Sequence, residues 1–410
     1  PHPLPPPAAV IGDGEIEARA LLSVAAVRAR CALVLAAAAR GETRHFRLVP
    51  ERLDAVADHV AAVTRRRYPD LVIPYHSRWR HFAAGGVDRA ALVAPGADPA
   101  ETARARIDLA VVSVLLDAGA GPEWRFCERE TGLTLTRSEG LAVASLRAMA
   151  DGLFSADPAR PWRADAAALV RLSEDDLARA CQHGPGNELL GIEGRARLLR
   201  RLGDAAASRP DLFGAPARLG RLYNSWHSRR MALPAPDILA TLLDAFAEIW
   251  PGGARLGKMP LGDCGRHPAV PGDGLVPFHK LAQWLAYSLI EPLEEAGFRI
   301  VERDGLTGLA EYRNGGLFLD GGVLAARDPD LPRRPLEVFS EPVVEWRALT
   351  VALIDRLASL VRARLGRSAA ELPLARVLEG GTWMAGRELA FARRADGAPP
   401  LTIASDGTVF

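Results

Sequence analysis

The chain contains little cysteine, and what it contains is scattered. Four cysteines stand far apart among 410 residues, at positions 31, 127, 181 and 264, and none belongs to a Cys-X-X-Cys pair. Cys264 and His267 have a ligand-like gap, but no second pair follows them. Because a structural zinc site takes four such ligands, we expect no metal. The scattered cysteines also predict reduced thiols. We expect no organic cofactor.

An excess of one charge and long apolar runs are also missing. Lys and Arg number 51 against 50 Asp and Glu, so no global field favours nucleic acid or an anionic membrane. No run of 18 uncharged apolar residues occurs, which predicts no transmembrane span. The proline-rich residues 1–14 lack the basic and apolar regions of a signal peptide. We therefore expect an extended N-terminal tail and a cytoplasmic protein.

Several common catalytic motifs are absent. The sequence has no Gly-X-Ser-X-Gly nucleophile elbow, no phosphate-binding P-loop and no Gly-X-Gly-X-X-Gly followed by an acidic partner. Chemistry in this chain must therefore come from a site that these motifs do not describe.

Helical periodicity dominates what is present. Residues 15–40, 50–67, 98–121, 137–154, 276–297 and 341–366 have helical spacing, and the pattern stays helical from 165 to 250. Residues 387–410 alternate around two Asp-Gly turns, which predicts a β-hairpin. We predict a mainly α fold with minor β elements and a C-terminal β-hairpin. Residues 15–410 would form one domain, with a soft subdivision near 155–250.

Charges stand among apolar residues in "LAEYRNGGLFLDGGVL", residues 309–324. Burying a charge costs several kcal/mol unless it is paired. Glu311 is a candidate general base or cation stabiliser, which Arg313 and Asp320 would orient. The alternative is a structural ion pair between Glu311 and Arg313 at a buried turn.

The helix predicted near residue 276 carries a polar group at its start. His279 and Gln283 are one turn apart and share a face, and Lys280 and Trp284 share the adjacent one. Free N–H groups beside a lysine would bind an anion. A solvated polar face is the alternative.

Residues 75–82, "YHSRWRHF", combine basic and aromatic side chains. Arg80 and His81 are candidates for holding an anion, and Trp79 for stacking a planar group. A surface loop with an anchoring tryptophan is the alternative.

Five stretches together resemble a family of proteins of unknown function encoded with a uracil catabolic pathway, as its fourth component. They are "VIPYHSRWRHFAAGGVDR", "VSVLLDAGAGPEWRF", "RSEGLAVASLRAMADGLFS", "GLAEYRNGGLFLDGGVL" and "VVEWRALTVALID". Stretches in the same order more distantly resemble the queuosine-salvage N-glycosidases, helical enzymes related in fold to DNA glycosylases. Those enzymes cleave the N-ribosidic bond of a nucleoside 5′-monophosphate.

The second resemblance implies roles for individual residues. The family's catalytic carboxylate, which precedes Tyr-Arg, falls on Glu311, next to Tyr312. Its phosphate-facing lysine falls on Lys280, and Asp117 stands in the matching Leu-Asp-Ala stretch. This chain has Glu where that family has Asp, and Asn-Gly-Gly where the family has Val-Pro-Gln. These differences imply a different pocket for the base.

These observations lead to one functional expectation and two alternatives. We expect an N-ribosidase that acts on a small product of uracil breakdown, such as ribosylurea or its 5′-phosphate. Glu311 would act at the anomeric carbon, and Lys280 would hold a phosphate with His279 or Arg80. Trp79, Trp124 or Trp284 would wall the leaving group, and residues 75–82, 117–124, 279–284 and 311–320 would converge on one pocket.

The first alternative is a non-catalytic, nucleotide-binding partner or regulator of the same pathway. The second is a nucleic-acid glycosylase, against which the near-neutral charge argues. We thus expect a small-molecule substrate and neither a nucleic acid nor a membrane as partner, and the sequence leaves the oligomeric state open.

Overall fold

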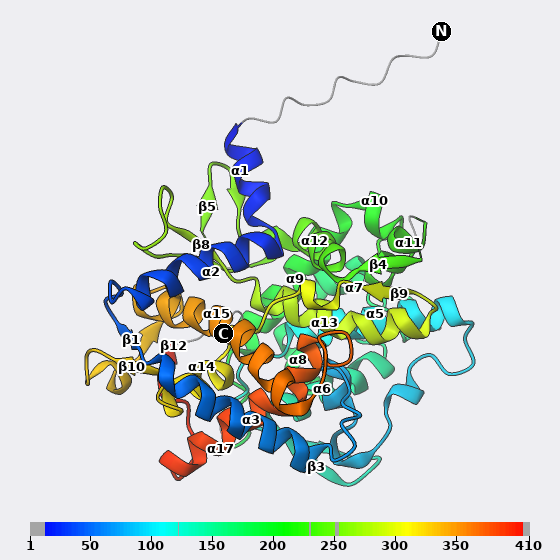
Figure 1. Cartoon of the computed structure of the whole chain (residues 1–410). Coiled ribbons are helices and arrows are strands. Elements are labelled where there is room, and N and C mark those ends of the chain that lie inside the picture. Colours follow the sequence, from blue (N-terminus) through cyan, green and yellow to red (C-terminus); the bar gives the residue numbers. More distant parts are fainter. Residues whose placement is uncertain (1–12, 122, 229–230, 251–253, 405–410) are drawn as a thin grey trace.

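The structure is a computed structural model that describes residues 13–121, 123–228, 231–250 and 254–404. Helices dominate it, and the strands form only two-stranded pairs (Figure 1). The mainly α fold predicted from periodicity is confirmed. Most of the predicted tail, residues 1–12, lies outside the described residues.

The elements have the following bounds. The α-helices are α1 (Asp13–Leu21), α2 (Val24–Ala39), α3 (Leu53–Arg67), α4 (Arg78–Phe82), α5 (Pro99–Leu115), α6 (Arg137–Ala150), α7 (Ala166–Arg171), α8 (Glu174–Ala180), α9 (Ile192–Ala207), α10 (Pro210–Phe213), α11 (Leu222–His227), α12 (Ala235–Phe246), α13 (Lys280–Glu295), α14 (Tyr312–Asp320), α15 (Glu341–Leu365), α16 (Leu374–Val377) and α17 (Trp383–Arg393). Short 3₁₀ turns are η1 (Pro50–Arg52), η2 (Ala84–Gly86), η3 (Ala90–Leu92), η4 (Leu219–Arg221), η5 (Ala247–Ile249), η6 (Arg303–Gly305) and η7 (Leu331–Arg333), and η8 (Leu378–Thr382) is a π-helical turn.

The strands pair as six two-stranded units among the described residues. The antiparallel pairs are β1 (Phe46–Leu48) with β10 (Leu324–Ala326), β2 (Arg125–Glu128) with β3 (Leu133–Thr136), β5 (Arg255–Leu256) with β6 (Met259–Pro260), and β7 (Cys264–Arg266) with β8 (Leu275–Pro277). The parallel pairs are β4 (Ala232–Pro234) with β9 (Arg299–Val301), and β11 (Leu336–Glu337) with β12 (Ile403–Ala404).

Two predicted elements differ from the observed ones. The predicted helix at 15–40 is broken into α1, which ends at Leu21, and α2, which Ser23 caps by accepting the N–H of Ala26. The predicted C-terminal hairpin is wrong for the described residues. Residues 387–393 continue α17, and Ile403–Ala404 pair with Leu336–Glu337 instead, because a strand distant in sequence supplies the hydrogen bonds.

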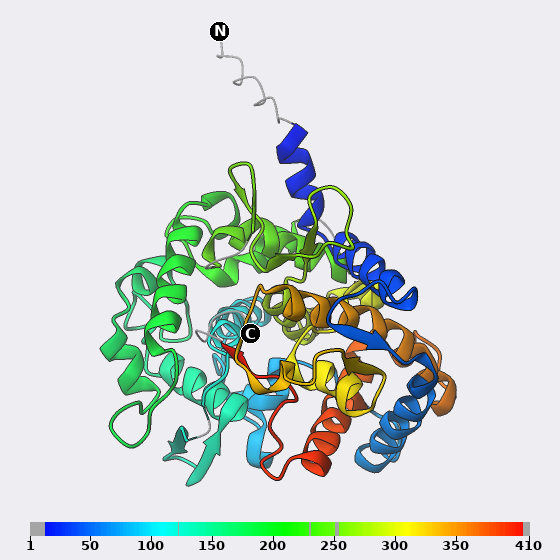
Figure 2. The same ribbon diagram turned by 90° about the vertical axis from the view of Figure 1, so that its left-hand side faces the viewer.

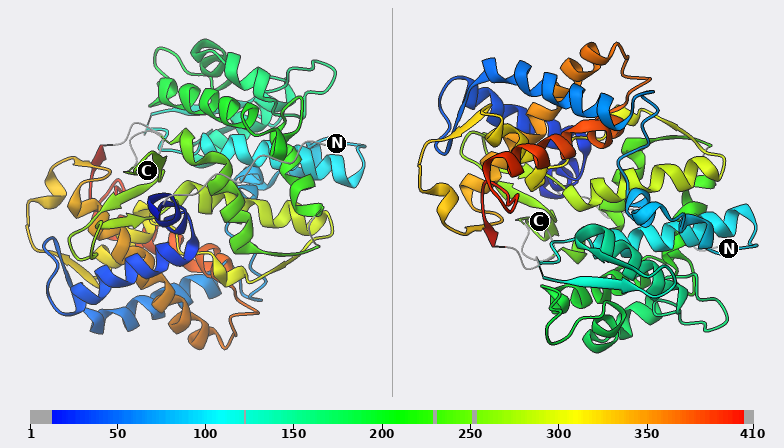
Figure 3. Two further views of the ribbon diagram at one scale, coloured as in Figure 1. Left: turned by 90° about the horizontal axis from the view of Figure 1, so that it is seen from above. Right: turned by 90° about the horizontal axis from the view of Figure 1, so that it is seen from below.

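The helices surround one continuous cluster of buried apolar residues that extends from Val24 to Leu401. The long helix α15 packs against α2 and α3, α14 against α17, and α13 against α5 and α12. Figures 2 and 3 show helices α7–α11 on one side of the molecule, and the N- and C-terminal helices on the other. Segments distant in sequence thus meet along the middle of the molecule.

No single helix in the described residues is long and apolar enough to cross a membrane. Helices α1 and α2 pass that test only as a pair, and an 80° bend separates them.

Candidate functional site

A hollow of about 600 Å³ lies where seven parts of the chain meet. Its lining residues come from the segments 76–81, 117–121, 137–138, 280–284 and 309–313, and from Trp383 and the stretch 396–403. Its volume falls within the range of small-molecule sites, about 300–1,000 Å³. Each of the four segments expected to converge on one pocket contributes lining residues.

Glu311 is the buried carboxylate of this hollow. It is the N-cap of α14, and its Oε2 and Oε1 accept the backbone N–H groups of Arg313 and Asn314 at 2.7 and 2.6 Å. Burial raises the pKa of Glu311, although these two hydrogen bonds and the charge of Lys280 oppose the shift. A carboxylate with a raised pKa is a stronger base than a solvated one, and Glu311 lines the hollow where a substrate would bind.

No side-chain ion pair joins Glu311 to Arg313 in the described chain. Arg313 instead donates from Nη1 to the carbonyl of Gly397 at 2.8 Å, and its guanidinium lies 5.1 Å from the ring centre of Tyr312. The ion-pair alternative for this turn is therefore wrong, because the backbone N–H groups of α14 take the carboxylate.

Lys280 lies in the same hollow, at the first position of α13. Burial lowers the pKa of its ammonium, and the charges of Glu311 and Asp117 oppose that shift. Lys258 and Lys280 are the two lysines in the chain. A strongly hydrated ammonium group has thus been placed between two carboxylates where water is partly excluded.

The start of α13 is held by Asp263, which the sequence analysis missed. Its Oδ2 accepts the N–H of Lys280 at 3.0 Å, and both of its oxygens pair with Arg347 at 2.8 and 2.7 Å. The helix N-terminus predicted as an anion site is therefore already occupied by a carboxylate of the chain. Any anion near Lys280 would depend on its side chain.

Asp117 is positioned by a buried arginine. Arg78 pairs with Asp117 at 2.9 Å and is fixed by Ser113 and by the carbonyl of Ser138. Burial would raise the pKa of Asp117, but the charge of Arg78, a hydrogen bond from Ser138 and the charge of Lys280 help to lower that pKa. Asp117 is therefore an ionised carboxylate that lines the same hollow as Glu311.

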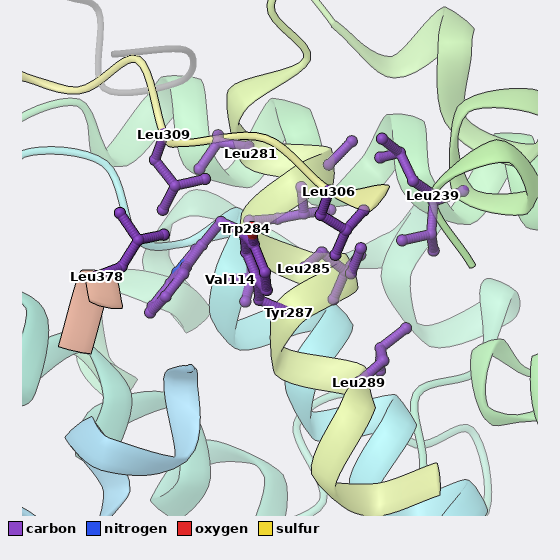
Figure 4. Packing of buried hydrophobic residues seen from close by; sticks show 14 of the residues in the cluster. Val114, Leu239, Leu281, Trp284, Leu285, Tyr287, Leu289, Leu306, Leu309 and Leu378 are labelled. Carbon is purple, nitrogen blue, oxygen red and sulfur yellow. The ribbon is translucent and has the colours of Figure 1, made fainter. Parts of the chain in front are cut away.

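Trp284 supplies an apolar wall. Figure 4 shows its indole ring beside Leu309 and Leu378. The ring centres of His76 and His81 lie 4.7 and 5.9 Å from that of Trp284. One wall of the hollow is thus aromatic and can stack a planar group.

Seven of the predicted site residues line this hollow, and six do not. The lining ones are Glu311, Arg313, Tyr312, Lys280, Trp284, His81 and Asp117. Asp320 lies at the far end of α14, where it pairs with Arg394 at 2.5 Å.

His279 and Gln283 turn away from the hollow. His279 has a left-handed backbone, with φ of 50°, and its Nε2 lies 3.0 Å from the carbonyl oxygen of Leu21. Gln283 makes two hydrogen bonds to Thr307. Its Oε1 accepts the backbone N–H of Thr307 at 2.9 Å, and its Nε2 donates to Oγ1 of Thr307. Both side chains are satisfied by the scaffold.

The remaining three predicted residues are also held elsewhere. Arg80 pairs with Glu291 and lines an adjoining hollow of about 870 Å³, which shares His76, His81, Arg137 and Trp383 with the first. Trp79 donates to the carbonyl of Ser288, and Trp124 to that of Cys181. The two tryptophans are core anchors, as their burial requires for the indole N–H.

The structure adds lining residues that the site prediction did not include, chiefly His76, Arg137, Trp383 and Asp396. Arg137 has a left-handed backbone, with φ of 53°, and makes no hydrogen bond or ion pair with the described residues. Non-glycine residues rarely adopt that conformation, and such strain concentrates at functional sites. No sequence signal marks Arg137, whereas His76 lies in residues 75–82, the basic and aromatic stretch described above.

Among the described residues, one group of side chains away from the hollow has donor atoms close enough to share a metal ion. The candidate ligand atoms of His45, Glu341 and Glu345 lie within 4.8 Å of one another. Both oxygens of Glu345 already accept hydrogen bonds, from the backbone N–H groups of residues 44–46 and beside His267 at 3.1 Å. This carboxylate is saturated by the turn that it holds.

Comparison with known proteins places the chain in a family. Residues 20–410 match the family described as "Protein of unknown function (DUF1688)". The chain belongs to this family. It is 36% identical over 411 residues to "Uracil catabolism protein 4" of Lachancea kluyveri, covering 90% of this chain and 93% of that one. It is 38% identical over 401 residues to "Protein urg3" of Schizosaccharomyces pombe (strain 972 / ATCC 24843), covering 95% of this chain and 98% of that one. The predicted membership in a uracil catabolism family is thus confirmed.

Proposed function

We propose that the protein is an N-ribosidase that hydrolyses a small nucleoside or nucleotide-like intermediate of uracil catabolism. Ribosylurea or its 5′-phosphate is the substrate that we propose, with urea as the leaving group. The observation that carries the proposal is the buried Glu311 carboxylate, which faces the same hollow as Lys280 and Asp117. The relatives support the pathway, since one of them is named as a uracil catabolism protein.

The chemistry of N-ribosidic bonds matches this charge distribution. Cleavage passes through an oxocarbenium-like state in which positive charge develops at the anomeric carbon. Glu311 would stabilise that charge and accept a proton from the attacking water. Its raised pKa suits the second task, because a stronger base takes the proton more readily.

The hollow also offers a place for a phosphate. Lys280 and Arg137 line it, and Arg137 has no ion partner among the described residues. A 5′-phosphate near these two cations would orient the ribose with its anomeric carbon toward Glu311. In this arrangement Arg137 takes the part first expected of His279 or Arg80, which the scaffold holds elsewhere.

The deciding experiment is a turnover assay on the purified full chain. Ribosylurea and its 5′-phosphate are supplied separately, and released urea is quantified against time together with ribose or ribose 5-phosphate, respectively. We expect equimolar urea and sugar product from at least one substrate. Tight binding without release would instead support a non-catalytic partner of the pathway, and neither binding nor release would end both readings.

A further inference from the structure

His76 is held by a carboxylate on one side and is open on the other. Its Nδ1 lies 2.9 Å from Oε2 of Glu379, and its backbone N–H donates to the carbonyl of Ala375. Burial would raise the pKa of Glu379, but hydrogen bonds from His76 and Tyr68 and the charge of Arg67 lower it. An ionised carboxylate accepts, so Nδ1 carries a proton and donates it to Glu379.

The other ring nitrogen of His76 is available to a ligand. Nε2 makes no hydrogen bond to any described residue, and His76 lines both the inner and the adjoining hollow. The ring stands 4.7 Å from that of Trp284, so its plane is fixed by packing as well as by Glu379. The imidazole is thus held in one orientation with one nitrogen presented to the site.

Glu379 itself is fixed by an unusual backbone. It lies in the π-helical turn η8, and its Oε1 accepts Tyr68 Oη at 3.1 Å and Arg67 Nη2 at 3.2 Å. π-Helical turns are rare and occur frequently at functional sites. The turn leads directly into Trp383, which lines both hollows.

A second histidine nearby is in the opposite environment. Nδ1 of His81 lies 3.0 Å from Nη1 of Arg78, which can only donate, so this nitrogen of His81 must accept. Burial and the charge of Arg78 lower the pKa of His81. One site therefore contains an imidazole that accepts a hydrogen bond from an arginine and a second imidazole that donates one to a carboxylate. Titratable groups in opposed environments are how enzymes separate acid and base roles.

We infer that His76, oriented by Glu379, is the general acid that protonates the leaving nitrogen, and that Glu379 is its positioning residue. The inference rests on the proposed function. Water adds to the anomeric carbon as the C–N bond breaks, and the bonding pair stays on nitrogen. His76 acts in its doubly protonated form: the leaving nitrogen takes the proton from Nε2, the Nδ1–H stays bonded to Glu379, and Glu311 takes a proton from the water. The products are ribose and urea, and proton exchange with solvent resets both residues.

The leaving group provides the test. Ribosylurea needs a proton to release urea, whereas 4-nitrophenyl β-D-ribofuranoside releases its phenolate without one. We expect His76→Asn to lower kcat on ribosylurea by about 10²-fold or more, and to lower it less than about 10-fold on the nitrophenyl substrate. Equal losses on both substrates, or no loss on either, would overturn the acid role.

The pH profile tests the positioning role of Glu379. The charged groups facing His76 are Glu379 from η8, His81 from α4, and Glu311, Lys280 and Arg137 across the hollow. Glu379→Gln removes the anionic partner, so the basic limb of kcat should move to lower pH, and His76→Asn should abolish that limb. An unmoved limb in Glu379→Gln would remove Glu379 from the mechanism.

A matched control, a second histidine–carboxylate pair, exists between α3 and α17. Nε2 of His59 on α3 lies 3.5 Å from Oε2 of Glu388 on α17, and neither residue lines either hollow. His59→Asn and Glu388→Gln should leave both the leaving-group ratio and the pH profile unchanged. If wild type releases no urea from either ribosylurea form, the proposed function itself fails. An active wild type with a fully active His76→Asn overturns only this inference.

Discussion

The carboxylate of Glu311 has two roles, one in the helix and one in the hollow. It caps α14 through two backbone N–H groups, and it faces the hollow. A capping oxygen keeps lone pairs free for a further contact, so the cap does not exclude a role toward a ligand. The cap also fixes the direction of the carboxylate without a side-chain partner.

Replacing Glu311 with Gln should separate these uses. The amide has one acceptor oxygen in place of two, so the cap weakens, and we expect a loss of about 0.5–2 kcal/mol in unfolding free energy. Turnover should fall by about 10²-fold or more because the charge is lost. Thermal denaturation and the urea assay measure the two effects.

Asp320→Asn is the control on the same helix, since Asp320 pairs with Arg394 outside the hollow. The Asp320→Asn variant should have the same turnover per folded molecule as wild type. An active Glu311→Gln would show that the carboxylate serves only the helix.

Lys280→Ala should affect a phosphorylated ligand most. We expect a weakening of about 1.5–3 kcal/mol for ribosylurea 5′-phosphate, the scale of a charge-assisted hydrogen bond, and far less for ribosylurea. Affinities of both ligands for wild type and variant measure the difference. Equal losses for both would assign Lys280 to the ribose or to the scaffold.

The same variant predicts a change with pH. The ammonium of Lys280 opposes the burial that raises the pKa of Glu311. Without it that pKa should rise further, so the acid limb of turnover should move to higher pH. A limb that moves to lower pH would contradict this electrostatic coupling.

Arg137 bears a conformational cost that glycine would not. A left-handed backbone costs a non-glycine residue roughly 1–2 kcal/mol. Arg137→Gly should therefore unfold at the same or a higher temperature, while binding of the phosphorylated ligand weakens. Arg137→Ala loses the guanidinium and keeps the strained backbone, so calorimetry of the two variants separates strain from charge.

At the scale of elements, the β2–β3 hairpin leads into Arg137 and is held by a buried charge cluster. Glu128 at the end of β2 accepts Arg89 and Arg147, and its carboxylate is 1% exposed. Burial would raise the pKa of Glu128, but hydrogen bonds from Arg89, Thr131 and Arg147 lower it to about 2. The hairpin is thereby fixed against the start of α6.

Glu128→Gln should destabilise the protein by about 3 kcal/mol at pH 7, because it leaves the buried Arg89 without its anionic partner. The pKa in the folded state lies below the ordinary 4.5, so the ionised carboxylate contributes its full stability above pH 4.5. That contribution is lost as the pH falls through about 2. The difference between wild type and variant in urea denaturation should therefore shrink from pH 5 to pH 2.

Helix α14 lies close to both α17 and α15 because a glycine stands at each contact. A Cβ added to Gly386 would lie 2.3 Å from the carbonyl oxygen of Arg313. One added to Gly315 would lie 2.5 Å from the indole of Trp346, which donates to the carbonyl of Gly315. The Asn-Gly-Gly sequence after Tyr-Arg therefore follows from helix packing, and it places Glu311 beside the C-terminal loop.

At the scale of the whole molecule, burial decides which thiols can react. Cys31, Cys181 and Cys264 are buried, and burial raises the pKa of each, to about 12 for Cys181 and Cys264. Cys127 is exposed. The thiolate is the reactive form, so one thiol of four should be open to reagents in the native state.

Labelling with a disulfide-exchange reagent tests this. We expect one fast-reacting thiol per native chain and four after denaturation. Cys127→Ser should abolish the fast phase. Fast reaction of a second thiol would show that the core around it opens readily.

Local sequence determined the helices and the identity of several polar lining residues. Apolar spacing and caps act within a few residues, and α5, α6, α13 and α15 accordingly lie where periodicity predicts them. The segments carrying Glu311, Lys280, Asp117 and His81 were recognisable because each combines charge or aromatic character with an apolar surrounding.

Only the tertiary structure decided which of these side chains face the hollow. One left-handed residue turns His279 to the carbonyl of Leu21, and Asp263 closes the helix end beside it. Glu379 meets His76 across 303 positions of sequence. No local pattern encodes such contacts, because they depend on packing between segments whose order along the chain says nothing about their distance in space.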